Sequence, residues 1–179
     1  MDVYFGIDNG VSGSVGTLTV EGDITTSEFM HTPVGMEQDY TKKKKNISRI
    51  DMPVLYRMLK KEIRDAKRAC VCLERPMVNP KRFQASASAL RALEATLIVI
   101  QLLTINRKKK NLDPIALQYV DSKEWQKMYL TKGIKGASAL KENSMVLGLR
   151  RFPQHEAVIR KQKDADGLWL AEFCKVSFR

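Results

Sequence analysis

The sequence predicts one α/β domain in which a mixed five-stranded sheet is flanked by helices. Two observations carry this prediction. Apolar strands and helical patterns follow one another in the order three strands, helix, strand, helix, strand, helices, which is typical of an antiparallel meander that feeds parallel strands through crossover helices. The 179 residues are enough for one full hydrophobic core and few for two. We therefore expect a single domain over residues 1–179.

The first three strands form the predicted antiparallel meander, at residues 3–8, 15–20 and 24–33. The first is a short apolar run, and the second alternates apolar and polar side chains as a half-buried strand does. Gly22 lies between two acidic residues in a hairpin signal that joins the second strand to the third. Residues 33–46 lose the apolar pattern and include four consecutive lysines, which predicts a loop.

The other elements are predicted from helical spacing and from buried apolar runs. Asp51 and Pro53 mark a helix start, after which apolar residues recur at helical spacing until about residue 68. Strands are expected at residues 69–74 and 115–120, with a long Ala- and Leu-rich helix between them at residues 85–105. Further helices are expected to begin at Ser122, to cover residues 138–147 and to run from about residue 164 to 176.

The formal net charge of +11 favours a polyanionic partner. A strong positive field attracts nucleic acid and makes binding depend on salt through counterion release. Charge alone also allows a ribosome-associated protein or a merely soluble basic protein. The sequence shows neither a signal-peptide pattern nor a segment of membrane-spanning length and apolarity. We therefore expect a soluble, unsecreted protein of a cytoplasm or an organellar matrix, without a membrane partner.

The three cysteines, Cys70, Cys72 and Cys174, are an odd number. The first two alternate within an apolar strand, so their side chains should point to opposite faces of the sheet. No disulfide framework is indicated, and the spacing lacks the second pair of ligands that a zinc site needs. Buried thiols in a reducing compartment are the expected state.

Carboxylates stand where the predicted elements begin and end. Asp8 closes the first strand, Glu74 closes a buried strand, and Asp164 and Asp166 open the last helix. Each has an ordinary structural explanation: a turn hydrogen bond for Asp8, an ion pair with Arg75 for Glu74, and helix capping for one of the two others. Strand ends in α/β sheets are also where polar groups gather into sites.

Such carboxylates would repel one another at close range unless divalent cations neutralised them. Hard oxygen ligands suit Mg²⁺, with Mn²⁺ as an alternative, and two ions roughly 3.5–4 Å apart assist phosphodiester hydrolysis in many nucleases. Together with the basic charge, this set of residues predicts a metal-dependent nuclease with two ions in its site.

Several segments resemble the RuvC-like Holliday junction resolvases of the RNase H-like, retroviral integrase superfamily. Their first-strand motif, their central glutamate strand and their closing helix are similar to residues 5–10 (FGIDNG), 72–76 (CLERP) and 166–173 (DGLWLAEF). Residues 120–127 (VDSKEWQK) and 151–153 (RFP) resemble segments of the phage and organellar branch. The similarity spans nearly the whole chain, and the order and spacing of the motifs are more specific than any single one.

The resemblance implies an RNase H-like fold with Asp8, Glu74 and Asp166 as metal ligands and a fourth ligand just before Asp166. Family members commonly have an acidic residue or histidine three positions before the final aspartate, where this chain has Lys163. Asp164 is two positions before it and can join the site only from a turn that precedes the helix, because residues two apart on a helix face nearly opposite sides. Lys163 could contact the scissile phosphate or simply face solvent, and Lys127 has a similar, weaker claim.

The resemblance also implies a homodimer, with the helix that starts at Ala85 as a candidate contact; ordinary burial against the sheet is the alternative. Contacts to DNA phosphates are expected from residues 107–110 and from the lysine run at residues 42–45, although both could be solvated loops. Phe83 could stack on an unpaired base where the family enters the junction centre. The candidate DNA-binding residues are Lys42, Lys43, Lys44, Lys45, Asn79, Lys81, Arg82, Phe83, Lys127 and Lys163.

The function that the resemblance implies is resolution of four-way DNA junctions in recombination and repair, by paired symmetric nicks that leave 5′-phosphate and 3′-hydroxyl ends. A non-catalytic branched-DNA-binding relative and an RNA–DNA hybrid ribonuclease remain as alternatives, and the latter would recognise 2′-hydroxyls and A-form shape. Residues 8–14 also look like the first phosphate loop of actin-like ATPases and sugar kinases. Those folds need a second related domain, for which the sequence has no counterpart.

Overall fold

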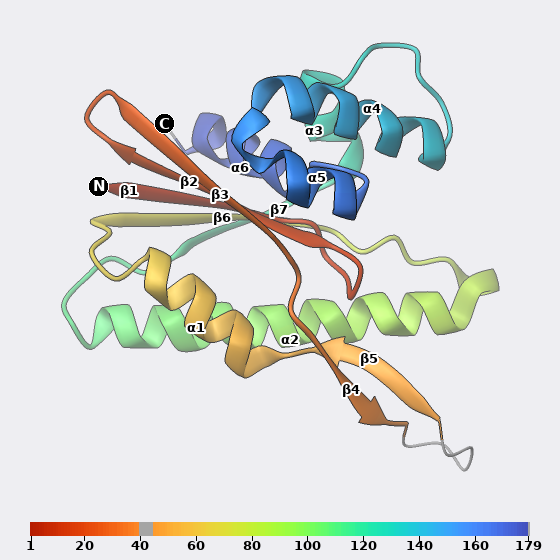
Figure 1. Ribbon diagram of the computed structural model, residues 1–179. Helices are drawn as coiled ribbons and strands as arrows, with labels where there is room; N and C mark the ends of the chain where they lie inside the picture. The colour runs from red at the N-terminus through yellow and green to blue at the C-terminus, as the bar shows by residue number, and fades with distance from the viewer. Residues whose placement is uncertain (40–44, 179) are drawn as a thin grey trace.

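The computed structural model describes residues 1–39 and 45–178, and its centre is a five-stranded sheet (Figure 1). The strand order is β3 (Ile24–His31), β2 (Ser14–Glu21), β1 (Asp2–Ile7), β6 (Arg68–Glu74) and β7 (Ala116–Val120). The first three strands pair antiparallel, whereas β1, β6 and β7 run parallel. The predicted mixed α/β sheet, a meander that feeds parallel strands, is confirmed.

Helices cover both faces of the sheet. One face carries α1 (Met52–Glu62) and the long α2 (Phe83–Lys108); the other carries α3 (Ser122–Tyr129), α4 (Ala137–Arg151), α5 (Glu156–Gln162) and α6 (Asp166–Ser177) (Figure 1). The pleat of the strands divides the core accordingly, because successive side chains point to opposite faces. Phe5 belongs to the core beneath α1 and α2, and its neighbour Tyr4 to the core on the side of α6.

Glycines let α6 lie directly on the backbone of β1 and β2. A Cβ added to Gly6 would be 2.1 Å from the nitrogen of Ala171, and one added to Gly16 would be 2.3 Å from the carbonyl oxygen of Gly167. Gly6 and Gly16 are paired across the two strands, so together they form a flat platform for the helix. The start of α6 is thereby fixed beside the carboxyl end of β1.

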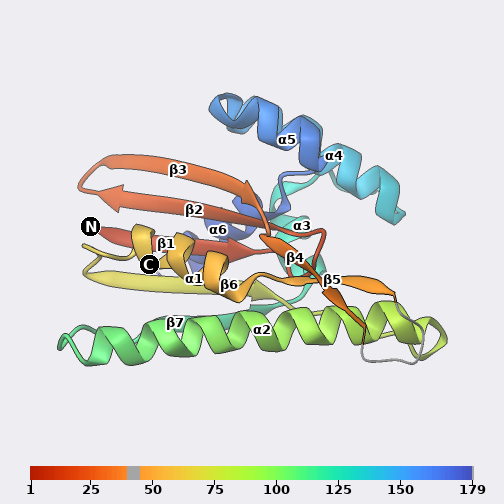
Figure 2. The ribbon, with the colours of Figure 1, turned by 60° about the horizontal axis from the view of Figure 1, so that its bottom comes forward.

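The predicted loop over residues 33–46 is wrong in part. Apart from residues 40–44, which lie outside the described part of the chain, this segment forms strand β4 (Val34–Gln38), and β5 (Asn46–Ile50) pairs with it in an antiparallel ribbon. The ribbon lies beside α2 (Figure 2). Most of its side chains are exposed, and a peripheral ribbon of this kind leaves no apolar alternation in the sequence.

Helix boundaries also differ from the prediction. Helix α1 ends at Glu62 rather than near residue 68, and α2 extends to Lys108 after a short 3₁₀ turn at Pro80–Arg82. The unpredicted helix α5 follows a second 3₁₀ turn at Pro153–His155. The three cysteines are buried, free thiols.

The helical segment Pro80–Lys108 is long and apolar enough to cross a membrane by length and composition alone. The expectation that no segment reaches this length and apolarity is therefore wrong. Core helices of soluble proteins meet the same measure.

Candidate metal centre

Three of the four predicted carboxylates meet at the end of the sheet where β1 and β6 finish. Asp8 follows β1, Asp164 lies in the turn after α5, and Asp166 begins α6. One carboxylate oxygen from each lies within 4.8 Å of the others. Asp164 and Asp166 are buried, while Asp8 is partly exposed. This spacing is close enough for the three side chains to share a cation.

Glu74 faces the same place from the neighbouring strand, although it lies outside the group within 4.8 Å. Because β1 and β6 are parallel and Ile7 pairs with Leu73, Asp8, which follows β1, and Glu74, the last residue of β6, lie at the same level. Both lie along one open cleft of about 650 Å³, together with Asp166. The structure thus brings all four predicted carboxylates to one end of the sheet.

The Glu74 carboxylate is held by two donors from α3. The Ser122 hydroxyl donates to its Oε1, and the indole N–H of Trp125 donates to its Oε2 over 3.1 Å. Trp125 is completely buried, so its ring fixes the direction of the N–H. Donors of this kind orient a ligand and tune its affinity for metal.

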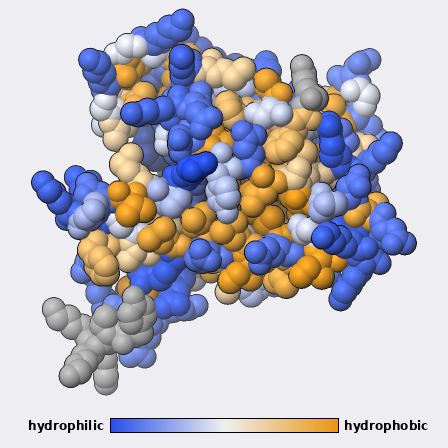
Figure 3. All heavy atoms as spheres, turned by 180° about the vertical axis from the view of Figure 1, so that it is seen from behind, coloured by the Kyte–Doolittle hydropathy of each residue, from blue (hydrophilic) through white to orange (hydrophobic). Residues whose placement is uncertain are grey.

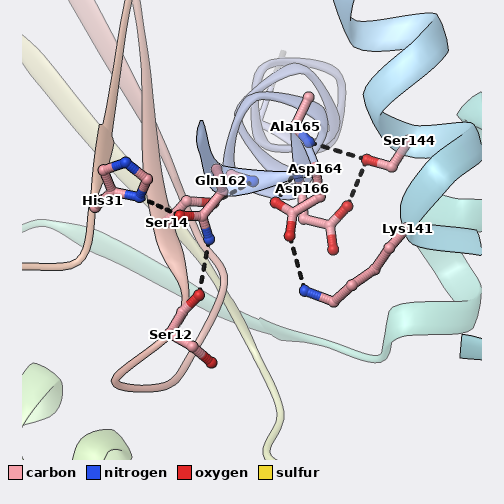
Figure 4. A network of polar contacts seen from close by, with 10 residues as sticks. Ser12, Ser14, His31, Lys141, Ser144, Gln162, Asp164, Ala165 and Asp166 are labelled. Atoms are coloured by element: carbon pink, nitrogen blue, oxygen red, sulfur yellow. Dashed lines mark hydrogen bonds and ion pairs between the residues drawn. The ribbon is translucent and has the colours of Figure 1, made fainter. Parts of the chain in front are cut away.

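Asp164 reaches the site because the chain turns sharply before α6. Lys163 ends α5 with a φ of 66°, in the left-handed region, and Asp164 then points inward with its Oδ1 accepting from the backbone N–H of Asp166 over 3.3 Å. The turn is tied to the β1–β2 loop by Gln162, which bonds to His31 and donates to the Ser12 carbonyl over 2.7 Å (Figure 4). Asp164 thus lies in the turn before α6, the placement from which it can join the site, and the helix begins at Asp166 rather than near residue 164.

Two residues of α4 complete the site, and sequence reasoning missed both. The Lys141 ammonium lies 2.7 Å from Oδ2 of Asp164, and the Ser144 hydroxyl donates to Oδ1 of Asp166 over 2.5 Å (Figure 4). They are three residues apart and therefore share one helix face. That spacing was the available signal, but a lysine in a chain with 31 basic residues is not distinctive.

Burial and mutual repulsion raise the pKa values of Asp8, Glu74 and Asp166. Although part of Asp8 is exposed, protein surrounds its carboxyl group, and burial with the charges of Glu74 and Asp166 raises its pKa well above the usual value. Burial and the charge of Asp164 raise the pKa of Asp166 to about 7. Burial also raises the pKa of Glu74. Burial lowers the pKa of Lys141, but its contact with Asp164 outweighs this and raises it.

This arrangement fits divalent metal. The donors are hard carboxylate oxygens that lie close together. Their mutual repulsion disfavours the state in which all of them are ionised, unless a cation is bound between them. The one ammonium in contact with the group, among the described residues, pairs with Asp164, which leaves the charge of Asp8 and Asp166 incompletely balanced. A second positive charge at the site would relieve this repulsion.

The crowded carboxyls predict that, without divalent ions, thermal stability falls as pH rises. The folded-state pKa of Asp166, about 7, lies above its usual 3.8, so the folded protein holds protons that the unfolded chain has lost. This stabilisation is complete below about pH 4 and disappears as pH rises through about 7. Melting temperatures measured from about pH 5 to 8 in EDTA should therefore fall, and Mg²⁺ should restore them at the upper end.

The control for this titration is Asp166→Asn, which removes the carboxyl group whose pKa is raised to about 7. The variant should show a flatter pH dependence and a smaller gain from Mg²⁺. A wild-type melting temperature that rises over this range in EDTA would contradict the account.

The other predicted DNA contacts are scattered. Asn79, Lys81, Arg82 and Phe83 lie in the exposed segment that leads from the cleft into α2, and the Asn79 side chain accepts from the Lys81 N–H. Lys45, Lys127 and Lys163 are exposed and do not line the cleft. Lys42, Lys43 and Lys44 lie outside the described residues. The exposed basic residues that do line the cleft are Arg75, Lys123 and Lys141.

Arg107 corrects the expectation that residues 107–110 form an exposed phosphate grip. Its side chain is buried and donates to the carbonyl oxygens of Ala66, Lys67 and Asp113. Only the three lysines after it are exposed. Arg107 is therefore structural, because buried carbonyl groups need the donors that it supplies.

No protein-family model and no curated protein matches the chain. Solved structures do. The chain is similar to "T. thermophilus RuvC in complex with Holliday junction substrate", with a TM-score of 0.52 and 15% identity, over 94% of this chain and 90% of that one. A second structure, "Thermus thermophilus RuvC structure", has a TM-score of 0.48 and 11% identity over the same shares. The first likeness shows that the fold is RuvC-like, within the RNase H-like class.

Proposed function

We propose that this chain is a metal-dependent endonuclease that resolves four-way DNA junctions. The observation that carries the proposal is that Asp8, Glu74 and Asp166 line one open cleft, with the buried Asp164 within 4.8 Å of Asp8 and Asp166, in a protein whose net charge is +11. A basic surface attracts the phosphate backbone, whereas an acidic cluster would repel it unless cations were bound there. The RuvC-like fold supports the choice of branched DNA as substrate.

The four carboxylates are the proposed ligands of two Mg²⁺ or Mn²⁺ ions. When bound, such ions supply a nucleophile at neutral pH and neutralise the charge that develops on the phosphate. The side chains of this protein hold the ligands in place: Ser122 and Trp125 fix Glu74, and Ser144 fixes Asp166. Lys141 pairs with Asp164, and its side chain is partly exposed along the cleft.

Divalent-ion dependence and the chemistry of the ends test this proposal. A synthetic four-way junction should be cut in Mg²⁺ or Mn²⁺ and not in EDTA, and its products should carry 5′-phosphates and 3′-hydroxyls that ligase joins. Products with 3′-phosphates would exclude the proposed chemistry. The full set of carboxylates disfavours a non-catalytic branched-DNA-binding relative, which has no need to keep mutually repelling acids.

Trp125→Phe should weaken metal binding by about tenfold to a hundredfold, because it removes the indole N–H that orients Glu74. Isothermal titration with Mn²⁺ measures the affinity, and thermal melting separates the effect from lost packing. Tyr129→Phe is the matched control on the same helix, since the Tyr129 hydroxyl has no hydrogen-bond partner among the described residues. Equal Mn²⁺ affinities in the two variants would show that Trp125 does not position the ligand.

Phe83 is the proposed wedge at the branch point. It begins α2, its side chain is 77% exposed, and Met77 and Val78 are exposed in the segment before it. Exposed apolar side chains that gather in one segment, unlike single ones, mark a binding surface. Its place after the cleft-lining residues Pro76 and Met77 favours stacking against a base that the branch leaves unpaired.

Phe83→Ala should lower junction affinity by about tenfold, in line with the loss of one base-stacking contact, while affinity for linear duplex stays unchanged. Fluorescence anisotropy with both DNA species gives the comparison. Ile24→Ala is the control, because Ile24 is similarly exposed but lies at the β2–β3 turn. An equal loss on duplex and junction would remove the wedge from the proposal.

Homodimer formation is proposed through the outer face of α2. Leu90, Ile98, Leu102 and Ile105 are exposed and recur at helical spacing, whereas Ala92, Val99 and Leu103 on the other face are buried in the core. Figure 3 shows apolar side chains gathered in a band across this side of the molecule. Burial against the sheet thus explains one face of α2, and a second copy would cover the other.

We also propose that the protein belongs to the phage and organellar branch of this family. A location in a cytoplasm or an organellar matrix is part of the same proposal. The branch rests on residues 120–127, within which Ser122 and Trp125 are the two side chains that hold Glu74. A role in recombination or repair follows if the substrate is a four-way junction.

A further inference from the structure

The positive charge of the protein is concentrated at the end of the sheet opposite the carboxylates. Residues 57–67 and 106–113 contain nine basic and three acidic side chains, a net charge of +6 out of +11 for the whole chain. Five exposed lysines among them, Lys60, Lys67, Lys108, Lys109 and Lys110, make up what we call the distal basic surface. Lys60 lies in the last turn of α1 and Lys67 follows that helix, while Lys108 ends α2 and Lys109 and Lys110 follow it.

Arg107 joins the two segments that carry these lysines. Its guanidinium donates to the carbonyl oxygens of Ala66 and Lys67 over 3.0 and 2.9 Å, and to that of Asp113 over 2.7 Å. The side chain is only 3% exposed. A buried arginine with three carbonyl partners is a rigid brace, so the lysines on both segments are presented side by side.

The lysines of the distal basic surface lack acidic partners. Lys61 pairs with Glu62 and Arg64 with Asp65, but no carboxylate in the described residues forms an ion pair with any of the five lysines. Lys108, Lys109 and Lys110 are also three consecutive like charges, and charges of one sign at close range repel one another. Helix C-termini favour cations, but Lys67, Lys109 and Lys110 lie beyond the helix ends. An anionic partner would compensate this repulsion.

The distal basic surface is too far from the carboxylates to contact the same phosphates. The N–H of Lys67 bonds to the Met1 carbonyl, at the start of β1, whereas Asp8 follows the end of that strand. A six-residue strand separates the two places by about 20 Å at its usual rise. Figures 1 and 2 show the C-terminal end of α2 at the same end of the molecule as the N-terminus of the chain.

We propose that the distal basic surface binds the phosphate backbone of a duplex arm about six base pairs or more from the branch, since duplex DNA rises about 3.4 Å per base pair. This inference rests on the proposed function only in taking DNA as the ligand. Lysine ammonium groups are point charges without a built pocket, so they fit a regular row of phosphates and contribute position and affinity rather than sequence choice.

The test compares junctions whose arms do or do not reach the distal basic surface. In an Asp8→Asn background, which stops cutting, binding is measured to four-way junctions with hairpin-capped arms of about 5 base pairs or open arms of about 25 base pairs. One variant carries Lys60→Gln, Lys67→Gln, Lys109→Gln and Lys110→Gln. The matched control carries arginine at the same four positions and keeps the charge. Circular dichroism checks the fold of both.

The glutamine variant should bind the long-arm junction about tenfold more weakly, with a salt slope smaller by about 2–4, one for each lost phosphate contact. Its affinity for the short-arm junction should stay the same, and the arginine variant should match the background protein on both. Equal losses on both junctions, or no loss on either, overturn the inference while leaving the proposed function intact. A background protein that binds neither junction overturns the proposed function itself.

Discussion

Asp8→Asn should reduce junction cleavage by at least about a thousandfold, since a lost metal ligand removes several kcal/mol of transition-state stabilisation. Asp8 is the carboxylate on which the site depends most. Its carboxyl group lies within 4.8 Å of those of Asp164 and Asp166 and is affected by the charge of Glu74, and no side chain of the described residues donates a hydrogen bond to it. It is therefore free to bind a cation. Cleavage rates in Mg²⁺ under single-turnover conditions measure the effect.

Binding by the Asp8→Asn variant should be kept or tightened, because the substitution removes a negative charge that faces phosphate while the basic surface stays. Asp121→Asn is the matched control: Asp121 also lines the cleft, but it is exposed and pairs with Arg75. That variant should cut at close to the wild-type rate. Full cleavage by Asp8→Asn would exclude Asp8 as a ligand.

Gly16→Ala should destabilise the fold by about 3 kcal/mol or more, the upper range for an overpacked site. The new Cβ would lie 2.3 Å from the Gly167 carbonyl oxygen, and both partners are backbone that cannot rotate away. The start of α6 would have to rise from the sheet. That movement would also break the hydrogen bond from the Gly167 N–H to the Ser14 hydroxyl and displace Asp166. Urea unfolding and Mn²⁺ titration measure the two effects.

Gly35→Ala is the control for Gly16→Ala. Gly35 is also a strand glycine, in β4, but nothing lies within 4 Å of the position that its Cβ would take. This variant should be as stable as the wild type. If Gly16→Ala unfolded at the same urea concentration as Gly35→Ala, then α6 would not rest on the strand backbone as described.

The carboxylates at the strand ends could be predicted because a buried strand appears in the sequence as a run of apolar residues, and an acidic residue at its end stands out. Asp8 and Glu74 each end a run of apolar residues, and parallel pairing of β1 with β6 brings those ends together. The choice between Asp164 and Lys163 could not be made in the same way. It depends on the left-handed φ of Lys163, which is uncommon for a residue other than glycine and has no signal in the sequence.

Contacts between distant segments were the main omission. Lys141 and Ser144 reach the site from α4, more than twenty residues before the aspartates that they contact, and only the packing of α4 on α6 brings them there. Arg107 belongs to a basic run in the sequence, but its carbonyl partners lie about forty residues away in the chain or beyond the next turn. A pattern of local spacing cannot report either arrangement.

Cleavage of a four-way junction beside linear duplex, flap and RNA–DNA hybrid of matched sequence tests the central claim most directly. With Mg²⁺ or Mn²⁺, the account predicts paired nicks at symmetric positions on opposing strands of the junction, products that ligase seals, and no comparable cutting of the other three substrates. Preferential cutting of the hybrid would instead identify a ribonuclease. Tight binding of the junction without any nick would contradict the proposed catalytic role of the four carboxylates.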